Sequence, residues 1–316
     1  MTRYLDPKND LPFKRIFGEH PDLLKSFLNA LLPLEADQRI ESLEYLPTEQ
    51  VPESPARKNS IVDVRCRDGY GRQFIVEMQM FWTTAFPNRM LFNASKAYVR
   101  QLDKKEHYYL LHPVYSLAIL NDIFDRKTPE FYHHFRIVNW QNTDEAILGL
   151  EFVLVELPKF RPEKWVDRRM AVLWLRFLKE VRENSAPGDL KESEEIRQAL
   201  DMCEEGAFTE AELFAYEKCW DVIYTEKAFL AASRAEGRAE GKAEGRAEGR
   251  AEGKAEGKAE GKAEGRAEGE AKGKAESLRS VVLNCQRDGF SPEQIQKITG
   301  LDGAKIQEIL RSNNEE

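Results

Sequence analysis

Two neighbouring stretches, residues 61–67 and 73–80, alternate apolar and polar side chains with a period of two. That alternation is typical of β-strands with one buried face. Residues 69–71 form a three-residue loop closed by Asp68 and Arg72. With this loop, even-numbered residues pair with even-numbered ones and odd with odd, so the even-numbered side chains of both strands lie on the same face. The pattern therefore predicts a β-hairpin of fixed register. Its apolar face consists of Val62, Val64, Cys66, Phe74, Val76, Met78 and Met80.

The same register places Asp63 directly opposite Glu77. Side chains opposed across antiparallel strands have Cβ atoms about 5 Å apart, and like charges placed there are destabilising. A divalent cation would compensate, because Mg²⁺ is held by one or two carboxylates together with water and phosphate oxygens. The alternative is an ordinary solvated face, on which carboxylates are common, although Ile61, Ile75 and Phe81 also lie on it. The hairpin alone leaves both interpretations open.

The pattern beyond the hairpin predicts an alternation of helices and strands. Helical periodicity marks residues 21–32 and 88–104, and a largely apolar run at 114–120 is typical of a central strand covered on both faces. Because strand, helix and strand form a right-handed crossover, the helix over 88–104 is expected to pack across the sheet that carries the carboxylates. Further strands are expected over 135–140 and 150–155, and further helices over 164–184 and 189–203.

The helix expected over 88–104 has two stripes of side chains. The predicted core-facing stripe is Leu91, Ala94, Tyr98 and Leu102, and the basic stripe is Arg89, Asn93, Lys96 and Arg100. Arg89, Lys96 and Arg100 are candidate contacts to nucleic-acid phosphates. A solvated helix face is the alternative interpretation, since such faces are common.

The hairpin and the N-terminal segment together resemble a known family. An Asp on one strand, followed after a turn by Glu-x-Gln, is similar to the active-site core of the PD-(D/E)xK nucleases. Residues 3 to about 230 resemble the recombination-promoting nuclease (Rpn) and putative transposase branch, whose start is similar to DPKNDLPFKRIFG at 6–18 and whose Leu-rich helix is similar to the one that ends in LNALL at 28–32. The resemblance implies an α/β, restriction-endonuclease-like core with a mixed sheet flanked by helices. It also implies a metal-dependent DNA endonuclease that is recombination-promoting or transposase-like.

The resemblance also implies a set of site residues. Asp63, Glu77 and the backbone carbonyl of Met78 would hold one Mg²⁺ or Mn²⁺ ion, which would lower the pKa of a bound water. Asp10 matches a position where the family supplies a further acidic residue. From residue type alone, Asp10 is equally a helix N-cap ahead of residues 11–17.

Gln79 occupies the position of the family's Lys. A neutral amide orients a water by hydrogen bonds but brings no positive charge to an anionic transition state. Lys14 and Lys96 are candidates to supply that charge. On this reasoning Gln79→Lys is expected to keep or raise the rate of cleavage.

Composition restricts the possible partners and sites. The net charge of −8 and pI near 5.5 argue against a general electrostatic clamp on DNA, so any DNA contact is expected to be local. The four Cys and five His show no zinc-ligand or disulfide spacing. No apolar signal segment or membrane-spanning run is present in the sequence, which predicts a cytoplasmic protein with no membrane partner.

Residues 234–276 form a nearly perfect tetrapeptide repeat of Ala-Glu-Gly followed by Lys or Arg. Ala, Glu, Lys and Arg favour a helix, whereas each Gly costs about 1 kcal/mol and the period of four gives almost no pairs of opposite charge at i,i+4. A lane of Gly would let another helix approach closely, so a self-associating helix that makes the protein a homo-oligomer is one interpretation. A flexible charged tether is the other.

The remaining residues predict a small C-terminal helical module. Helices are expected over 277–288 and 304–310, with a capped helix and a turn at Gly300 between them. The arrangement resembles a helix-turn-helix, but few basic side chains face outward, which favours an oligomerisation or packing module. The predicted organisation is a nuclease-like core at 1–160, a helical extension at 161–233, the repeat at 234–276 and this module at 277–316. The alternative functions are a catalytically weak or inactive DNA-binding member of the fold and an oligomeric scaffold.

Overall fold

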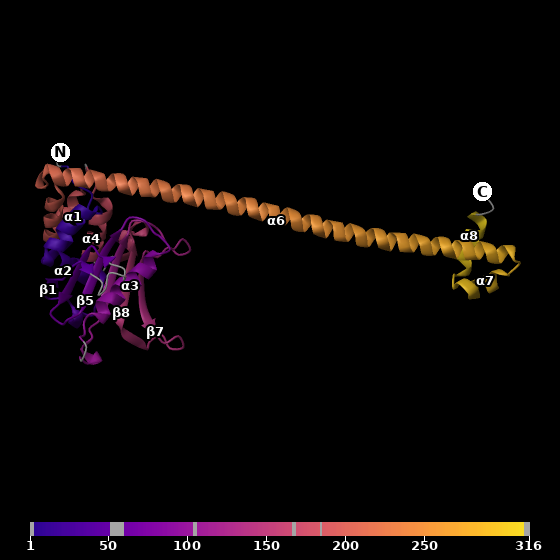
Figure 1. The fold of residues 1–316 in the computed structure, drawn as a ribbon, viewed down its shortest axis with the longest axis horizontal. Coiled ribbons are helices and arrows are strands. Elements are labelled where there is room, and N and C mark those ends of the chain that lie inside the picture. The colour runs from indigo at the N-terminus through magenta and orange to yellow at the C-terminus, as the bar shows by residue number, and fades with distance from the viewer. Residues whose placement is uncertain (1–2, 51–59, 104–105, 166–168, 184, 313–316) are drawn as a thin grey trace. The chain divides into compact units, whose positions relative to one another are not determined.

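The chain divides into two compact units, Met1–Leu230 and Ala231–Glu316. A computed structural model describes residues 3–50, 60–103, 106–165, 169–183 and 185–312. The first unit is built on a mixed β-sheet with helices on both faces, and the second is helical (Figure 1). This α/β architecture with a helical continuation is the fold class that the sequence predicts.

The main sheet of the first unit has six strands. They are β1 (Leu43–Tyr45), β4 (Val64–Asp68), β5 (Gln73–Gln79), β6 (Val114–Leu120), β7 (Tyr132–Val138) and β8 (Ala146–Glu156). Their order across the sheet is β1-β4-β5-β6-β8-β7, in which β5, β6 and β8 run parallel and the other neighbours are antiparallel. A separate small sheet pairs β2 (Glu49–Gln50) with β3 (Ser60–Ile61).

Six α-helices belong wholly or partly to the described residues of the first unit. They are α1 (Asp10–Glu19), α2 (Pro21–Leu31), α3 (Phe86–Val99), α4 (Arg169–Glu180), α5 (Glu194–Cys203) and the start of α6 (Glu210–Arg287). Short 3₁₀ helices lie at Ala36–Gln38, Tyr108–Leu110, Leu157–Lys159, Pro162–Trp165, Gly188–Glu192 and Glu205–Ala207. Helix α3 joins the parallel strands β5 and β6, which is the crossover that the sequence predicts.

The hairpin of β4 and β5 has the register that the alternation predicts. Cys66 lies opposite Phe74, so the sum of paired residue numbers is even as expected. The turn depends on Gly71, whose φ of 83° is left-handed and favours glycine. The Asp68 carboxylate accepts a hydrogen bond from the backbone N–H of Arg72 at 2.9 Å and so closes the loop.

Strand β4 begins later than the alternation predicts. Ser60–Ile61 pairs with β2 instead, and Val62 packs with Ile75 on the opposite face from the one predicted. The cause is Asp63, whose Oδ2 accepts the backbone N–H of Met78 at 2.7 Å. A side chain thus replaces a backbone carbonyl as the acceptor at this point, and the ladder between the two strands ends there.

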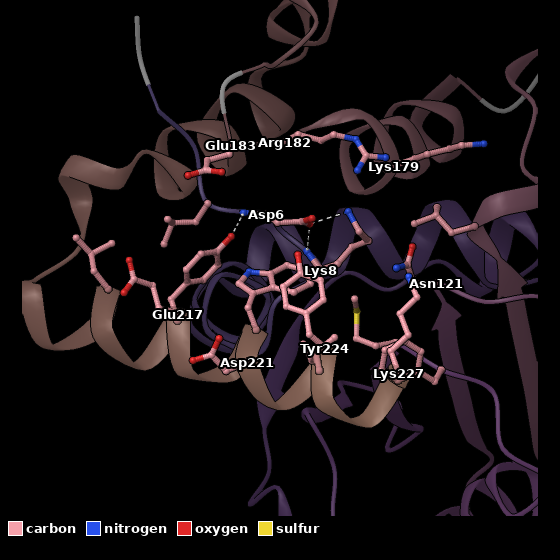
Figure 2. Close-up of a pocket in the computed structure, with 18 of the residues that line it drawn as sticks. Asp6, Lys8, Asn121, Lys179, Arg182, Glu183, Glu217, Asp221, Tyr224 and Lys227 are labelled. Atoms are coloured by element: carbon pink, nitrogen blue, oxygen red, sulfur yellow. Dashed lines mark hydrogen bonds and ion pairs between the residues drawn. The ribbon is translucent and has the colours of Figure 1, made fainter. Parts of the chain in front are cut away.

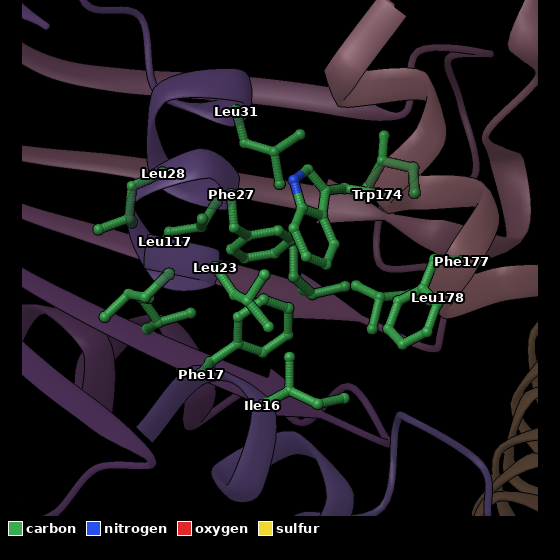
Figure 3. Close-up of a cluster of buried hydrophobic side chains, with 14 of the residues drawn as sticks. Ile16, Phe17, Leu23, Phe27, Leu28, Leu31, Leu117, Trp174, Phe177 and Leu178 are labelled. Atoms are coloured by element: carbon green, nitrogen blue, oxygen red, sulfur yellow. The ribbon is translucent and has the colours of Figure 1, made fainter. Parts of the chain in front are cut away.

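The larger hydrophobic core lies between the even-numbered face of the hairpin and helices α1, α2, α4 and α5. Figure 3 shows its centre, where Trp174 of α4 packs among side chains of α1 and α2. Its ring lies 5.4 Å from that of Phe17 and 5.7 Å from that of Phe27, measured between centroids. The indole N–H donates to Ser26 Oγ at 3.1 Å, so its one polar group is satisfied. This packing fixes α1 against the sheet.

Helix α3 covers the odd-numbered face with a different set of residues from the one predicted. Its buried residues are Phe86, Met90, Asn93, Ala94 and Ala97. The two alanines allow α3 to approach Ile75 and Val114 closely, while the larger Phe86 and Met90 fill the space over Ala118 and Leu120. Leu91, which was predicted to face the core, is instead 48% exposed. The helix is therefore rotated relative to the prediction, and Asn93 faces the interior.

The other predicted elements are present with shifted ends. β7 and β8 begin three and four residues earlier than the strands expected over 135–140 and 150–155, and α4 is shorter than the helix expected over 164–184. β7 is an edge strand with exposed residues, which obscures its alternation. Element ends are the positions that periodicity fixes least.

The repeat lies within one continuous helix, α6, whose 78 residues extend from Glu210 to Arg287. The helical interpretation of the repeat is therefore confirmed. A Cβ atom placed on any of the repeat's glycines meets no atom within 4 Å among the described residues, so the glycine lane is open. The ion pairs Arg266–Glu270 and Glu268–Lys272 occur where the sequence departs from the regular repeat, as the period of four requires.

The C-terminal module consists of the end of α6 with α7 (Pro292–Thr299) and α8 (Gly303–Ser312). Val282, Ile295 and Ile306 form its small core. Ser291 caps α7 with a full capping box, and Gly300 ends it in a left-handed conformation with φ of 70°. None of the helices in the described part of the chain is long and apolar enough to cross a membrane.

Candidate active site

Two acidic side chains lie together where the ladder between β4 and β5 ends. Asp63 immediately precedes β4 and accepts a hydrogen bond from the backbone N–H of Met78, and Glu77 projects from β5 on the α3 side of the sheet. Glu77 is 5% exposed, and its Oε2 atom has no hydrogen-bond partner among the described residues. An acceptor oxygen left unpaired in the interior is costly and calls for an explanation.

Both carboxyl groups hold their protons more tightly than usual. Burial raises the pKa of Asp63 from 3.8 to about 6, although the hydrogen bond from Met78 opposes the shift. Burial raises the pKa of Glu77 from 4.5 to about 7, with Arg89 lowering it and the neighbouring Asp63 raising it. The charged forms of this pair are therefore disfavoured in the metal-free protein.

The backbone carbonyl of Met78 opens toward the same side as Asp63. The carbonyl of the next residue, Gln79, accepts the N–H of Asn121 at 2.8 Å, on the side of β6. Adjacent residues of a strand direct their backbone groups to opposite sides, so the groups of Met78 point toward β4. Its N–H is the donor to Asp63. Two carboxylates and one carbonyl thus border one small region.

Gln79 is fixed at both ends of its amide. Nε2 donates to the carbonyl of Phe81 at 2.8 Å, and Oε1 accepts a hydrogen bond from the guanidinium of Arg89. That guanidinium also lies over the ring of Phe86, 5.0 Å from its centroid. From the sequence, Arg89 is a candidate contact to DNA phosphates, and Lys14 and Lys96 are the candidates for the positive charge missing at position 79. The structure places the positive charge of Arg89 directly beside Gln79.

Asp10 and Lys14 lie at the edge of this region. Asn9, not Asp10, caps α1, since the Asn9 side chain accepts the N–H of Leu11, so the N-cap interpretation of Asp10 is wrong. Asp10 forms an ion pair with Lys14 at 2.8 Å. The charge of Asp10 raises the pKa of Asp63 and that of Lys14 lowers it, so both act electrostatically on the acidic pair.

The two other cations of the basic stripe, Lys96 and Arg100, have different partners from Arg89. The ammonium of Lys96 donates a hydrogen bond to the backbone carbonyl of Gln50, and its pKa is lowered by desolvation and by Arg100. Arg100 also lowers the pKa of Arg65, after desolvation by burial. Lys96, Arg100 and Arg65 therefore make a second positive cluster, separate from the contact between Arg89 and Gln79.

Two buried amides near the site were missed in the sequence. Asn93 of α3 and Gln50 of β2 are both fully buried, and Gln50 Nε2 donates to the Asn93 carbonyl at 3.4 Å. Both amide atoms of Asn93 and Oε1 of Gln50 lack partners among the described residues. The sequence signal for Asn93 was its position between Met90 and Ala94, which are both buried. The predicted orientation of the helix instead placed Asn93 on the solvated basic stripe.

The donor set fits a hard divalent cation with few protein ligands. Within the described residues, no group of three or more His, Cys, Asp or Glu could hold a metal ion. Mg²⁺ does not require one, because it commonly binds one or two carboxylates and keeps waters or phosphate oxygens as its other ligands. The unpaired Oε2 of Glu77 is an available oxygen of the kind that such an ion takes.

The comparison with known sequences agrees with this geometry. The family described as PD-(D/E)XK nuclease family transposase matches residues 7–232, which includes the whole acidic region and the helices that support it. No curated protein and no solved structure matches the sequence. Since the match covers well over half of the chain, the protein belongs to the PD-(D/E)XK nuclease family transposases, the group to which the Rpn-type nucleases are related.

Proposed function

We propose that the protein is a metal-dependent endonuclease that hydrolyses phosphodiester bonds in DNA. Membership of the nuclease family supports the class of reaction. The observation that carries the proposal is the pairing of Asp63 with Glu77 at one point of the sheet, with an oxygen of Glu77 left without a partner among the described residues. Burial of two neighbouring carboxylates costs stability, and a bound cation would offset that cost.

Asp63, Glu77 and the Met78 carbonyl would hold one Mg²⁺ or Mn²⁺. Such an ion supplies a water of lowered pKa and positive charge against the scissile phosphate. Asp63 is already oriented by its hydrogen bond from Met78, so little ordering is needed when a ligand binds. Asp10, paired with Lys14, is a candidate for a further acidic contact at the edge of the site.

Gln79 and Arg89 would act on the substrate as a pair. The Gln79 amide is held by Phe81 and Arg89, so it presents fixed hydrogen-bonding groups to a water. The Arg89 guanidinium would stabilise the charge that builds up on the phosphate, which is the role of the family's Lys. Lys96 and Arg100 are proposed to contact DNA phosphates farther along the strand.

A specific observation favours a second candidate function. Gln79 is neutral, and Arg89 is bound to it rather than placed alone at the site. The same fold could therefore bind DNA and cut it slowly, with the repeat at 234–276 assembling the protein into a homo-oligomer. In that case activity would depend on assembly more than on the acidic pair.

Nicking of supercoiled plasmid in Mg²⁺ or Mn²⁺ tests the proposal. Asp63→Asn and Glu77→Ala are each expected to abolish nicking, and Glu41→Gln, which changes an exposed acid before β1, is the matched control. Cutting by either site variant at the rate of the unaltered protein would rule out the proposed site. Calorimetric titration with Mn²⁺ separates the two candidates, since an absent binding signal supports the second, a DNA-binding protein with weak or no cleavage.

A further inference from the structure

A cleft of about 1020 Å³ is lined in part by Phe81 and Asn121, the residues that hydrogen-bond to the side chain and the backbone of Gln79. It lies between the N-terminal segment and the first turns of α6, within the first unit, and Figure 2 shows its lining. Pockets of about 300–1,000 Å³ bury ligands of drug size, so this cleft has room for a short stretch of polymer. We call it the aromatic cleft, for the rings that line it.

The aromatic cleft begins where β5 ends. Its lining includes Phe81, whose carbonyl holds the Gln79 amide, and Asn121, whose N–H donates to the Gln79 carbonyl. Asp6 and Lys8 line another side and lead directly into Asp10 at the start of α1. Phe81 and Asn121 are hydrogen-bonded to Gln79, which is two residues from Glu77 on β5, so a DNA strand bound in the cleft would have a short distance to cover to the acidic pair.

One wall is a ladder of aromatic side chains on α6. Tyr216, Trp220 and Tyr224 are four residues apart and so share a helix face. Their rings are in contact, with centroids 6.2 Å apart for the first pair and 5.7 Å for the second, which is stacked. The Tyr216 hydroxyl accepts the backbone N–H of Asp6 at 3.0 Å and fixes the ladder against the body of the unit. Tyr224 is 62% exposed, so its ring has a free surface for a planar ligand.

The charges of the lining favour one form of DNA over another. The cations are Arg3, Lys8, Lys179, Arg182 and Lys227, and the anions are Asp6, Glu183, Glu205, Glu217 and Asp221, five of each. A neutral lining gives no counterion-release drive for a duplex. Stacking of unpaired bases on aromatic rings needs no net charge, and a few cations suffice to place the phosphates. In Figure 2, Tyr224 and Lys227 lie toward the end of the cleft that Asn121 lines.

We propose that the aromatic cleft binds single-stranded DNA adjacent to the scissile phosphate, with a base stacked on the free face of Tyr224, whose other face packs on Trp220, and phosphates at Lys179, Arg182 and Lys227. The proposal rests on the proposed function and adds the form of DNA that the site takes. It makes an unpaired segment the part of the substrate that the protein recognises. Duplex DNA without such a segment is then a poor ligand.

Fluorescence anisotropy of a short fluorescein-labelled oligothymidylate tests the inference, using the full chain in EDTA so that no cutting occurs. Trp220→Ala and Tyr224→Ala are each expected to raise Kd by about 5- to 100-fold, the effect of losing one stacked base. Trp140→Ala is the matched control, because Trp140 is 94% exposed and lies outside the cleft. A blunt duplex of matched length is expected to bind more weakly and to be insensitive to Tyr224→Ala.

The outcomes separate this inference from the nuclease proposal. Asp63→Asn should abolish nicking and leave oligothymidylate binding intact. If the unaltered protein binds oligothymidylate through Tyr224 but never cuts DNA in Mg²⁺ or Mn²⁺, the cleft is upheld and the nuclease proposal is refuted. Tyr224→Ala is decisive because this exposed ring can be removed at little cost to folding. Unchanged Kd in that variant overturns the inference. So does a change of oligomeric state in Tyr224→Ala with Kd unaltered, which would make the cleft a contact between protein chains.

Discussion

Glu77→Gln should make the metal-free protein more stable, although it removes a residue proposed to be essential for cutting. The variant keeps the shape of the side chain and removes its charge. Glu77 is 5% exposed and lies beside Asp63, so its ionised form is disfavoured in the folded protein. In the unfolded chain the same carboxyl group ionises freely. The cost of ionisation is therefore a cost to folding.

The magnitude and its pH dependence follow from the pKa of Glu77. Its folded-state pKa of about 7 lies above the ordinary value of 4.5, so the carboxyl group costs no stability below 4.5. The cost grows as the pH rises from 4.5 and is complete above about 7, where it amounts to about 3 kcal/mol. Glu77→Gln should recover about this amount at about pH 8 and almost nothing at about pH 4.

Urea unfolding in EDTA, followed by tryptophan fluorescence, measures the effect. Trp174 is fully buried in the core of the first unit, so its emission reports the unfolding of that unit. Glu41→Gln, at an exposed position, is the control and should change stability by no more than about 0.5 kcal/mol. Added Mn²⁺ should stabilise the unaltered protein but not Glu77→Gln. A variant no more stable than the unaltered protein at about pH 8, or equally stabilised at about pH 4, would refute the reasoning.

Three further expectations follow from the structure. Arg89→Ala should lower plasmid nicking by about 10²–10³-fold. Gln79→Lys should restore activity in the Arg89→Ala variant but should not raise it in the unaltered protein, because the new ammonium would face the Arg89 guanidinium. Faster nicking by the Gln79→Lys single variant would contradict this. Mn²⁺ affinity by calorimetry should rise from about pH 5 to about pH 8, because Asp63 and Glu77 must lose protons to bind it; a flat profile would argue against these ligands. Deletion of residues 234–276 should yield a monomer in sedimentation velocity, and circular dichroism showing only coil for a 235–269 peptide at every concentration would exclude helix pairing.

The hairpin could be predicted in detail because its determinants are local. Period-two alternation and a glycine turn set the register, which pairs Val64 with Val76 and leaves Asp63 and Glu77 as the next positions on the two arms. The parallel strand at 114–120 and the crossover helix followed from an apolar run and a handedness rule. A repeat with strong helix formers was expected to be helical if stabilised, and it is.

The rest of the site depends on contacts between distant parts of the chain. The face that α3 buries was predicted wrongly, because the prediction placed the larger Leu91 in the core. In the structure the small residues Ala94 and Ala97 face the sheet and let the helix pack closely against it, while Leu91 is exposed. That rotation decides that Arg89 reaches Gln79 and that Asn93 is buried. The aromatic cleft is lined by residues from both ends of the first unit, so no local sequence pattern predicts it.

The hydrogen bond from Met78 to Asp63 gives the two acids unequal freedom to change. Asp63 ends the β4–β5 ladder as well as lying at the proposed site, so its loss alters architecture and chemistry together. Glu77 Oε2 has no hydrogen-bond partner among the described residues, so no hydrogen bond of the fold depends on that oxygen. If cutting were lost, position 77 would lose that functional constraint, while position 63 would keep the hydrogen bond that ends the ladder. In proteins with this fold, an acid at position 63 is therefore weak evidence for nuclease activity, and an acid at position 77 is strong evidence.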